Sequence, residues 1–330
     1  MLRTARQFAT TTLIQRERSL FQNFKTTAAF ANVNISLLEP DTEVRKILVA
    51  SMRQSNFRSL AVRYTLVELS EALMTGHPDI IMLSLDHEAR ETCALVRAIR
   101  GNEIGTDPFP ILIALVTSPN PALAKLVLSA GFDDILIKPL APATLIERTI
   151  RFASGRKPFV ITSDYIGPDR RDKARTDGGT APSFEPPNPV LLRVKGGSPE
   201  AAKLMSVDHA IALLNMHKME RDAQATELLA QSIFELFSGG FDDTTLTKAR
   251  MELEKLILVT EDVQKRSLRG GSYGAATKPS ELLNALANRL YAETGPTSDF
   301  AFSPDDVRLL PEIARAVIHG IGPGKDEGEG

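Results

Sequence analysis

The stretch AGFDDILIKP, residues 130–139, says most about the fold. A helical pattern runs up to Ala130, and Gly131 is the residue type that most often follows the end of a helix. Two acids then precede the apolar run 135–137, and a Lys-Pro pair follows it. Short apolar runs with such boundaries are typical of strands buried in a sheet. The stretch therefore predicts the end of a helix, a tight turn and a buried strand that stops at Lys138.

The same alternation of short apolar runs and amphipathic stretches extends from residue 33 to residue 155. The predicted strands are Val33–Leu38, Ser59–Val62, Ile80–Leu85, Ile111–Val116 and Ile135–Ile137. The predicted helices begin near Asp41 and then cover Leu66–Met74, Glu88–Arg100, Pro121–Ala130 and Ala141–Phe152. Strands that alternate with helices form a parallel sheet covered on both faces. We therefore expect a five-stranded, doubly wound α/β domain with any ligand site at the carboxyl ends of its strands.

The rest of the chain divides by composition. Residues 1–32 carry five basic residues against one acid, and we expect a basic flexible arm; a mitochondrial targeting segment has the same composition. Residues 156–205 contain seven prolines and several glycines, which is typical of a linker, although the run Phe159–Thr162 has the character of an extra strand. Residues 206–320 return to helical spacing, and the tail 321–330 is expected to be disordered.

Glycine and proline breaks divide the region 206–320 into helices. The first is expected to end at Gly239, and the second begins near the cap residue Asp242. A third is predicted to start at the cap residue Ser280 and to run to about residue 293. Ser303 precedes a proline at the first helical position of the last helix, which Pro311 is expected to split.

Composition limits the classes of function. The chain has 330 residues, is 43% hydrophobic and has a net charge of −2. It contains no apolar run of the roughly 18–20 residues that a membrane-spanning helix needs. Cys93 is the only cysteine, so neither an internal disulfide nor a cysteine-based zinc site is possible, and we expect a cytoplasmic protein. Residues 241–330 hold 11 basic against 15 acidic residues, which argues against a nucleic-acid-binding face.

Residues 33–155 resemble the receiver (CheY-like) domains of response regulators. Residues 37–45, LLEPDTEVR, match the family's first strand, acid pair and helix with an early arginine. Residues 78–84, PDIIMLS, match its third strand, and residues 130–139 match its Ala-Gly-x-Asp-Asp and Lys-Pro pattern. The resemblance covers about 120 of the 330 residues. It implies a flavodoxin-like fold and a role in two-component, phosphorelay signal transduction.

The resemblance also implies a phosphorylation site, from which this chain departs. The position of the phosphoacceptor aspartate is Ser84, one of the two metal-binding acids is Pro40, and the aromatic switch is Ile135. A serine cannot form an aspartyl phosphate, proline has no side-chain oxygen and isoleucine has no ring. We therefore interpret residues 33–155 as a pseudo-receiver, degenerate at the phosphoacceptor.

Three residues of the family's site remain: Glu39, Thr117 and Lys138. Because Mg²⁺ is bound through carboxylates, Glu39 alone would hold it weakly, and we expect neither a metal nor another cofactor. We expect Lys138 to neutralise Glu39 across the old site. Asp86 lies two residues after Ser84 and is the alternative phosphoacceptor; we expect it instead to cap the following helix.

Residues 162–171, TSDYIGPDRR, are similar to a tail that follows some alphaproteobacterial receivers. One interpretation is a strap in which Tyr165 packs on the receiver and the arginines stay in solvent. The other is an interaction element in which Arg170 and Arg171 bind carboxylates or phosphates.

The pattern favours a non-enzymatic signalling protein whose pseudo-receiver binds a histidine kinase or another protein. We expect its C-terminal helices either to form a homodimer or to dock a partner. One alternative is a response regulator with a DNA-binding C-terminal output. Another is a receiver phosphorylated at Asp86, and a third is a phosphotransfer bundle that uses His217 beside Lys218. The five histidines show no metal-binding spacing.

Overall fold

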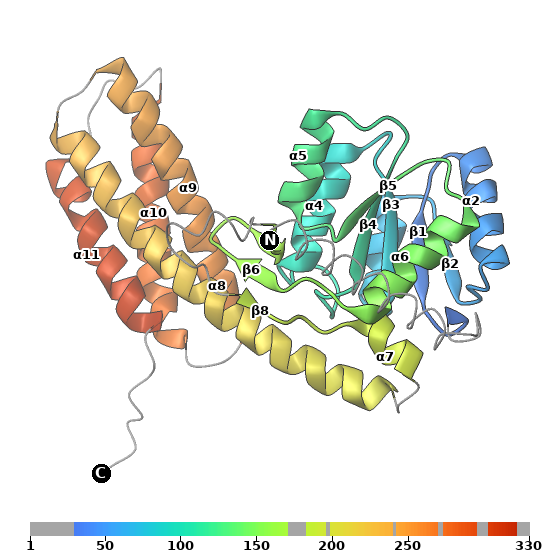
Figure 1. Cartoon of the computed structure of the whole chain (residues 1–330). Helices are drawn as coiled ribbons and strands as arrows, with labels where there is room; N and C mark the ends of the chain where they lie inside the picture. The colour runs from blue at the N-terminus through green and yellow to red at the C-terminus, as the bar shows by residue number, and fades with distance from the viewer. Residues whose placement is uncertain are drawn as a thin grey trace, which may run out of the picture. The chain divides into compact units, whose positions relative to one another are not determined.

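The structure, a computed structural model, describes residues 30–170, 183–195, 199–239, 242–269, 273–295 and 303–321. The chain divides into two compact units (Figure 1). The α/β unit comprises the described residues up to Val160 and those from Tyr165 to Ile211. The helical unit comprises Ile161–Asp164 and the described residues from Ala212 onward. Each unit is treated separately below.

Five parallel strands form the main sheet of the α/β unit, in the order β2-β1-β3-β4-β5. Their bounds are β1 (Ile35–Leu38), β2 (Leu60–Arg63), β3 (Ile80–Ser84), β4 (Ile111–Val116) and β5 (Asp134–Ile137). This order is that of the flavodoxin-like doubly wound fold, so the predicted fold class is confirmed. All five predicted strands are present, and their ends differ from the prediction by two residues at most.

Five helices connect and follow these strands, each with a sequence signal at one end. They are α2 (Thr42–Gln54), α3 (Leu66–Leu73), α4 (Ala89–Arg100), α5 (Pro121–Ala130) and α6 (Pro142–Ser154). The side chain of Asp41 accepts hydrogen bonds from the backbone of the first turn of α2, and Asn120 does the same for α5. Gly131 ends α5 with φ of 96°, a left-handed conformation that favours glycine.

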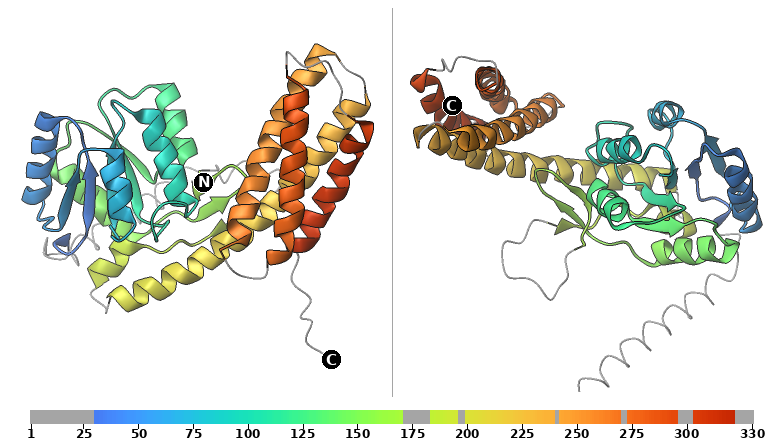
Figure 2. Two further views of the ribbon diagram at one scale, coloured as in Figure 1. Left: turned by 180° about the vertical axis from the view of Figure 1, so that it is seen from behind. Right: turned by 90° about the horizontal axis from the view of Figure 1, so that it is seen from above.

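Helices lie on both faces of the sheet (Figure 2), and an apolar layer fills the space between them and each face. Alternate strand residues face opposite layers, so Ile80 and Met82 pack in the layer that contains α2 and α6 side chains. Ile81 and Leu83 pack in the layer that contains side chains of α3, α4 and α5. All five residues of β3 are buried, which is why the central strands are continuous apolar runs.

The α/β unit begins before the predicted boundary at residue 33. The side chain of Phe30 is 1% exposed and its ring centroid lies 6.0 Å from that of Phe57. Residue 30 therefore belongs to the folded core, and the predicted C-terminal boundary of the arm, at residue 32, is too late in the sequence. The rest of that arm, residues 1–29, lies outside the described residues.

The predicted linker 156–205 carries structure over much of its described length. A second sheet has the order β7-β6-β8, with β6 (Phe159–Ile161), β7 (Ile166–Pro168) and β8 (Ser183–Phe184). Helix α7 (Pro189–Lys195) follows, and its residue Val190 is fully buried in the same apolar layer as Phe152. The linker prediction was wrong here because a few apolar side chains between the prolines supply enough burial to order the segment.

The helical unit contains the later part of α8 (Pro199–Ser238), α9 (Asp243–Ser267), α10 (Thr277–Glu293) and α11 (Pro304–Ile321). A short 3₁₀ helix, η3 (Gly274–Ala276), precedes α10. The helices lie side by side (Figure 2) and share one apolar core, which includes Ile233, Leu253, Leu286 and Leu310. Among the described residues, no helix combines the length and apolarity needed to cross a membrane.

Two predicted breaks in this region were wrong. Helix α10 begins at Thr277, not Ser280, because Pro279 fits within a first turn whose N–H groups need no helical partner. Pro311 does not split α11, which continues to Ile321. Leu310 and Ala314, on either side of the proline, are fully buried. Their burial offsets the roughly 3 kcal/mol that an internal proline costs a helix.

Candidate functional site

Four predicted site residues lie at the carboxyl ends of the strands. Each lies two positions after a side chain that packs in the layer containing α2 and α6. Because alternate residues of a strand point to the same face, each site residue lies on that face of the sheet. These pairs are Glu39 after Leu37, Ser84 after Met82, Thr117 after Leu115 and Lys138 after Leu136. The alternation of side chains along the strands therefore places these residues at the crevice that we expected at the strand ends.

Lys138 is the centre of this crevice. Its Nζ atom lies 2.6 Å from Oε2 of Glu39, 3.1 Å from Oγ of Ser84 and 2.6 Å from Oδ2 of Asp86. The side chains of Lys138 and Glu39 are 5% and 1% exposed. An ammonium group has three protons to donate, and three oxygens surround it here. The ion pair expected between Lys138 and Glu39 is present, whereas the contact with Asp86 was not predicted.

Asp86 does not cap α4, which corrects the prediction from sequence. The residue at that cap is Glu88, and it makes no side-chain hydrogen bond there. Asp86 instead accepts hydrogen bonds from the backbone N–H of Thr117, at 2.8 Å, and from its hydroxyl, at 2.7 Å. Burial alone would raise the pKa of Asp86, but hydrogen bonds from Lys138 and Thr117 outweigh it and lower that pKa from 3.8. The carboxylate is therefore ionised at neutral pH.

The remaining positions of the family's site offer no further ligand. Pro40 is exposed and contributes only its carbonyl, which accepts a hydrogen bond from Arg45 at 2.8 Å. The next acid, Asp41, is engaged at the cap of α2. Ile135 is half-buried and packs against the layer that contains α4 and α5. Within the described ranges, no group of three or more His, Cys, Asp or Glu side chains is arranged to hold a metal ion.

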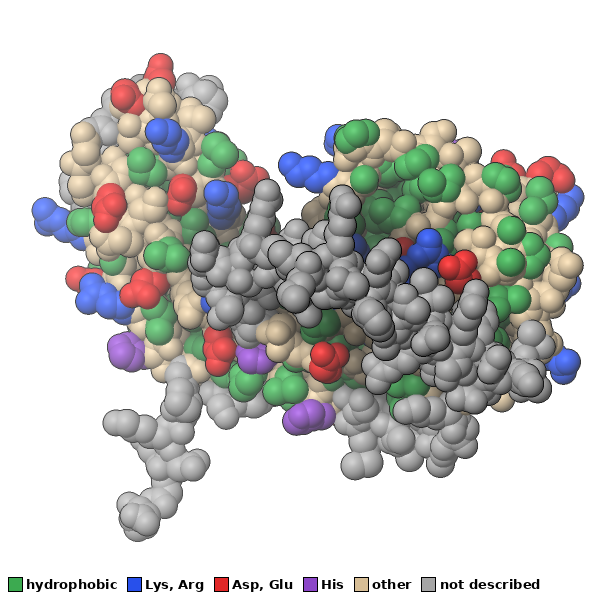
Figure 3. Space-filling view, in the orientation of Figure 1, with side chains coloured by type: hydrophobic (Ala, Val, Ile, Leu, Met, Phe, Trp, Pro, Cys, Tyr) green, Lys and Arg blue, Asp and Glu red, His purple; other side chains and the backbone are tan. Residues whose placement is uncertain are grey.

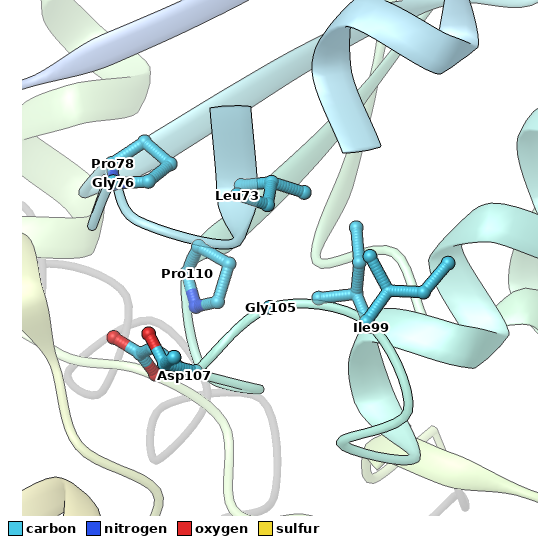
Figure 4. A pocket seen from close by; sticks show the side chains of 9 residues that line it. Leu73, Gly76, Pro78, Ile99, Gly105, Asp107 and Pro110 are labelled. Atoms are coloured by element: carbon cyan, nitrogen blue, oxygen red, sulfur yellow. The ribbon is translucent and has the colours of Figure 1, made fainter. Parts of the chain in front are cut away.

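Two cavities that border the main five-stranded sheet are very small. One of about 20 Å³ lies beside Ser84 and is also lined by Pro40, Tyr64 and His87. Another of about 10 Å³ lies at the opposite end of the strands, between Pro78 and Pro110 (Figure 4). Each has room for about one water molecule, whereas small-molecule substrates occupy pockets of about 300–1,000 Å³. Neither cavity is a substrate pocket.

The predicted strap lies against the 130–139 stretch. Tyr165 donates a hydrogen bond from its hydroxyl to the carbonyl of Pro168 at 2.9 Å, and burial raises its pKa. Arg170 donates to the carbonyl of Phe132 but remains an exposed residue. A Cβ atom on Gly131 would lie 2.6 Å from the carbonyl oxygen of Ile166, which shows how closely β7 approaches. Arg171 lies outside the described residues.

Asp133, in the same stretch, pairs with two arginines. Its carboxylate lies 2.6 Å from Arg100 and 3.0 Å from Arg156, and these three side chains are at most 3% exposed. Burial acts to raise the pKa of Asp133, but the two guanidinium groups hold it below 3.8. This cluster was missed from sequence, because nothing local to residues 100 or 156 distinguishes a buried arginine from an exposed one.

In the helical unit, the surroundings of His217 offer little for phosphotransfer. Its Nδ1 atom lies 3.5 Å from a carboxylate oxygen of Glu220, and its side chain is 21% exposed. The neighbouring Lys218 is turned into the core, where Nζ lies 2.5 Å from Asp222 and 2.9 Å from Asp262. Lys218 is therefore held by two acidic side chains of the core, away from His217.

Comparison with known proteins shows weak likeness only. No family model and no curated protein matches the chain. A solved structure described as a pilus assembly protein, CpaE2, from Sinorhizobium meliloti is 21% identical with a TM-score of 0.29, over 34% of this chain and 94% of that one. The response regulator DrrB from Thermotoga maritima is 19% identical with a TM-score of 0.31, over 39% of this chain and 57% of DrrB. The fold assignment therefore rests on the strand order alone.

Proposed function

We propose that this chain is a cytoplasmic, non-enzymatic signalling protein of a two-component system, which binds other proteins through a pseudo-receiver. One observation carries the proposal: Lys138 is held within 3.1 Å of Glu39, Ser84 and Asp86. In the family that residues 33–155 resemble, the corresponding lysine pairs with a phosphoryl group. Here its charge is already neutralised by the chain's own carboxylates.

The chemistry at Ser84 also opposes phosphoryl transfer. A serine hydroxyl must lose its proton to act as a nucleophile, and its hydrogen-bond partner here is an ammonium group, which cannot accept one. The carboxylates of Glu39 and Asp86, which share the ammonium group of Lys138 with this hydroxyl, are both paired with that lysine. The positive charge of Lys138 beside them weakens both as bases and as ligands for Mg²⁺.

The test is intact-mass analysis of the full chain after incubation with acetyl phosphate and Mg²⁺. We expect no change in mass, while a receiver with an intact phosphoacceptor, treated in parallel, gains one phosphoryl group. A stoichiometric adduct on this chain would overturn the proposal.

Phosphorylation of Asp86 is the second candidate function. It is favoured by an ionised carboxylate, 25% exposed, that lies 2.6 Å from Lys138. It is opposed by the engagement of both carboxylate oxygens in hydrogen bonds. The mass experiment distinguishes the two, since an adduct that forms on the wild type and is lost in Asp86→Asn would identify Asp86 as the acceptor.

The face formed by α5 and the edge strand β5 is the proposed protein-binding surface. Hydrophobic side chains gather there around a hollow (Figure 3). Leu128 on α5 is 37% exposed and Ile137 on β5 is 55% exposed. Exposed apolar patches of this kind commonly mark protein interfaces. If a histidine kinase or other signalling partner binds here, Ile137→Asp should weaken its capture by the full chain.

Self-association is proposed to use the helical unit. Met251 and Leu258 lie two turns apart on α9 and are 55% and 61% exposed, so they share one face of the helix. Sedimentation of the wild type should show a dimer that Leu258→Lys dissociates. An unaltered monomer for both proteins would exclude this mode.

A further inference from the structure

Asp86 lies where hydrogen-bond donors from two other strand ends converge. The N–H and hydroxyl of Thr117 follow β4, and the ammonium of Lys138 follows β5. All three donor–acceptor distances fall between 2.6 and 2.8 Å, and bonds of this kind to a carboxylate are among the stronger hydrogen bonds in proteins.

The donors are built into the sheet, whereas the acceptor comes from a loop. Lys138 is anchored by Glu39 at 2.6 Å and by Ser84 at 3.1 Å, independently of Asp86. Thr117 directly follows the buried strand β4. Asp86 belongs to the connection between β3 and α4, and its side chain is 25% exposed. Without it, the same donors would face an open edge of the crevice.

We infer that Thr117 and Lys138 form a binding site for a small oxyanion, with Asp86 as its tethered, permanent ligand. A ligand attached through the chain has a high effective concentration, so an external anion cannot compete with it at ordinary concentrations. The tether joins the ends of β3, β4 and β5 in one arrangement. The inference concerns the crevice of the proposed function but does not require the chain to signal.

Asp86→Ala tests the inference by emptying the site. The melting temperature of the full-length variant should be lower than that of the wild type, and sodium formate or inorganic phosphate should raise it saturably at constant ionic strength, whereas chloride should not. Binding to the folded state alone stabilises a protein in this way. Formate and phosphate distinguish a planar carboxylate site from one that also accepts a tetrahedral anion. The wild type should show no saturable response, only the general stabilisation that phosphate gives folded proteins.

Two controls separate this site from a general salt effect. Glu88→Ala removes an exposed acid two residues away that makes no cap hydrogen bond, and we expect no anion-specific rescue in it. Combining Asp86→Ala with Lys138→Met should abolish the rescue. Equal responses of Asp86→Ala to chloride, formate and phosphate would overturn the inference and leave the mass experiment on the wild type unaffected.

If Asp86→Ala does not fold, hydrogen exchange of Asp86→Asn replaces it. The amide cannot neutralise Lys138, so the backbone N–H of Thr117 should exchange faster than in the wild type. Unchanged exchange at Thr117 would contradict the inference.

Discussion

The guanidinium carbon of Arg156 lies 4.6 Å from the ring centroid of Phe159. Arg100 approaches the same ring at 4.9 Å, and both arginines pair with Asp133. A segment predicted to be a linker is thus held to the sheet by cation–π contacts, ion pairs and the burial of a whole phenylalanine. The folded α/β unit extends well beyond residue 155.

Phe159→Ala should therefore destabilise the full chain by about 3–5 kcal/mol, the usual range for removing a buried phenylalanine. Urea unfolding followed by circular dichroism measures the loss. Lys157→Ala, at an exposed position two residues away, should change the unfolding free energy by less than about 0.5 kcal/mol. Equal effects of the two substitutions would show that the segment is a linker after all.

Lys138→Met should leave Glu39 as a buried carboxylate that has lost its lysine partner. Removing one partner of a buried ion pair destabilises a protein by about 3–5 kcal/mol. Adding Glu39→Gln should recover part of that loss, because the unpaired charge is then gone. A double variant no more stable than Lys138→Met, measured by the same urea titration, would argue against the pairing.

Ser84→Asp alone should not restore phosphorylation. Pro40 still supplies no carboxylate, and the new side chain adds a third negative charge around Lys138, beside Glu39 and Asp86. We also expect the variant to lose roughly 1–3 kcal/mol of stability, because like charges then share one site. Stoichiometric labelling by acetyl phosphate in an intact-mass measurement would show that the crevice is still competent.

The helical unit should respond to pH through Asp222. Burial and the neighbouring Asp262 raise its pKa to about 8, although Lys218 opposes them. The folded state therefore binds a proton that the unfolded state releases near the ordinary pKa of 3.8. Stability from this group is fully present below pH 4 and is lost as the pH rises toward 8.

Urea titrations of the full chain at several pH values test this dependence. Between pH 4 and pH 8, the free energy of unfolding of Asp222→Asn should fall by about 1 kcal/mol or more less than that of the wild type. Glu227→Gln, an exposed acid on the same helix, should leave the wild-type decline unchanged. The pKa of Asp262 is lowered to about 2, chiefly by Arg266 and Lys218 acting against burial, so its own effect falls below pH 4.

Gly320→Ala should destabilise the packing of α11 on η3. A Cβ atom at Gly320 would lie 2.5 Å from the backbone N and 2.6 Å from the Cα of Ala276, and neither can move alone. Overpacking of this kind costs about 1–3 kcal/mol. Gly274→Ala is the matched control, because a Cβ there has nothing within 4 Å. Thermal unfolding of both variants would show whether the close contact matters.

Periodicity and helix caps were sufficient to predict the five strands of the main sheet and the five helices α2 to α6, since Asp41, Asn120 and Gly131 act through local hydrogen bonds and dihedral angles. The same reasoning failed at Phe159, whose partners lie up to 59 residues away at Arg100. It also misplaced Asp86, because the direction of a side chain beyond a strand end depends on a loop. The one sequence signal for the position of Asp86 in the crevice was its spacing of two residues from Ser84, which would place both side chains on one face of an extended strand.

Asp86 is part of the polypeptide, so every copy of the chain is synthesised with one ligand for the site formed by Thr117 and Lys138. On the inference above, nothing can hydrolyse it, and no phosphatase or donor supply can vary its occupancy. The occupancy of such a site cannot carry a signal. A cell would therefore adjust the effect of this site through the amount of the protein, by its synthesis and degradation.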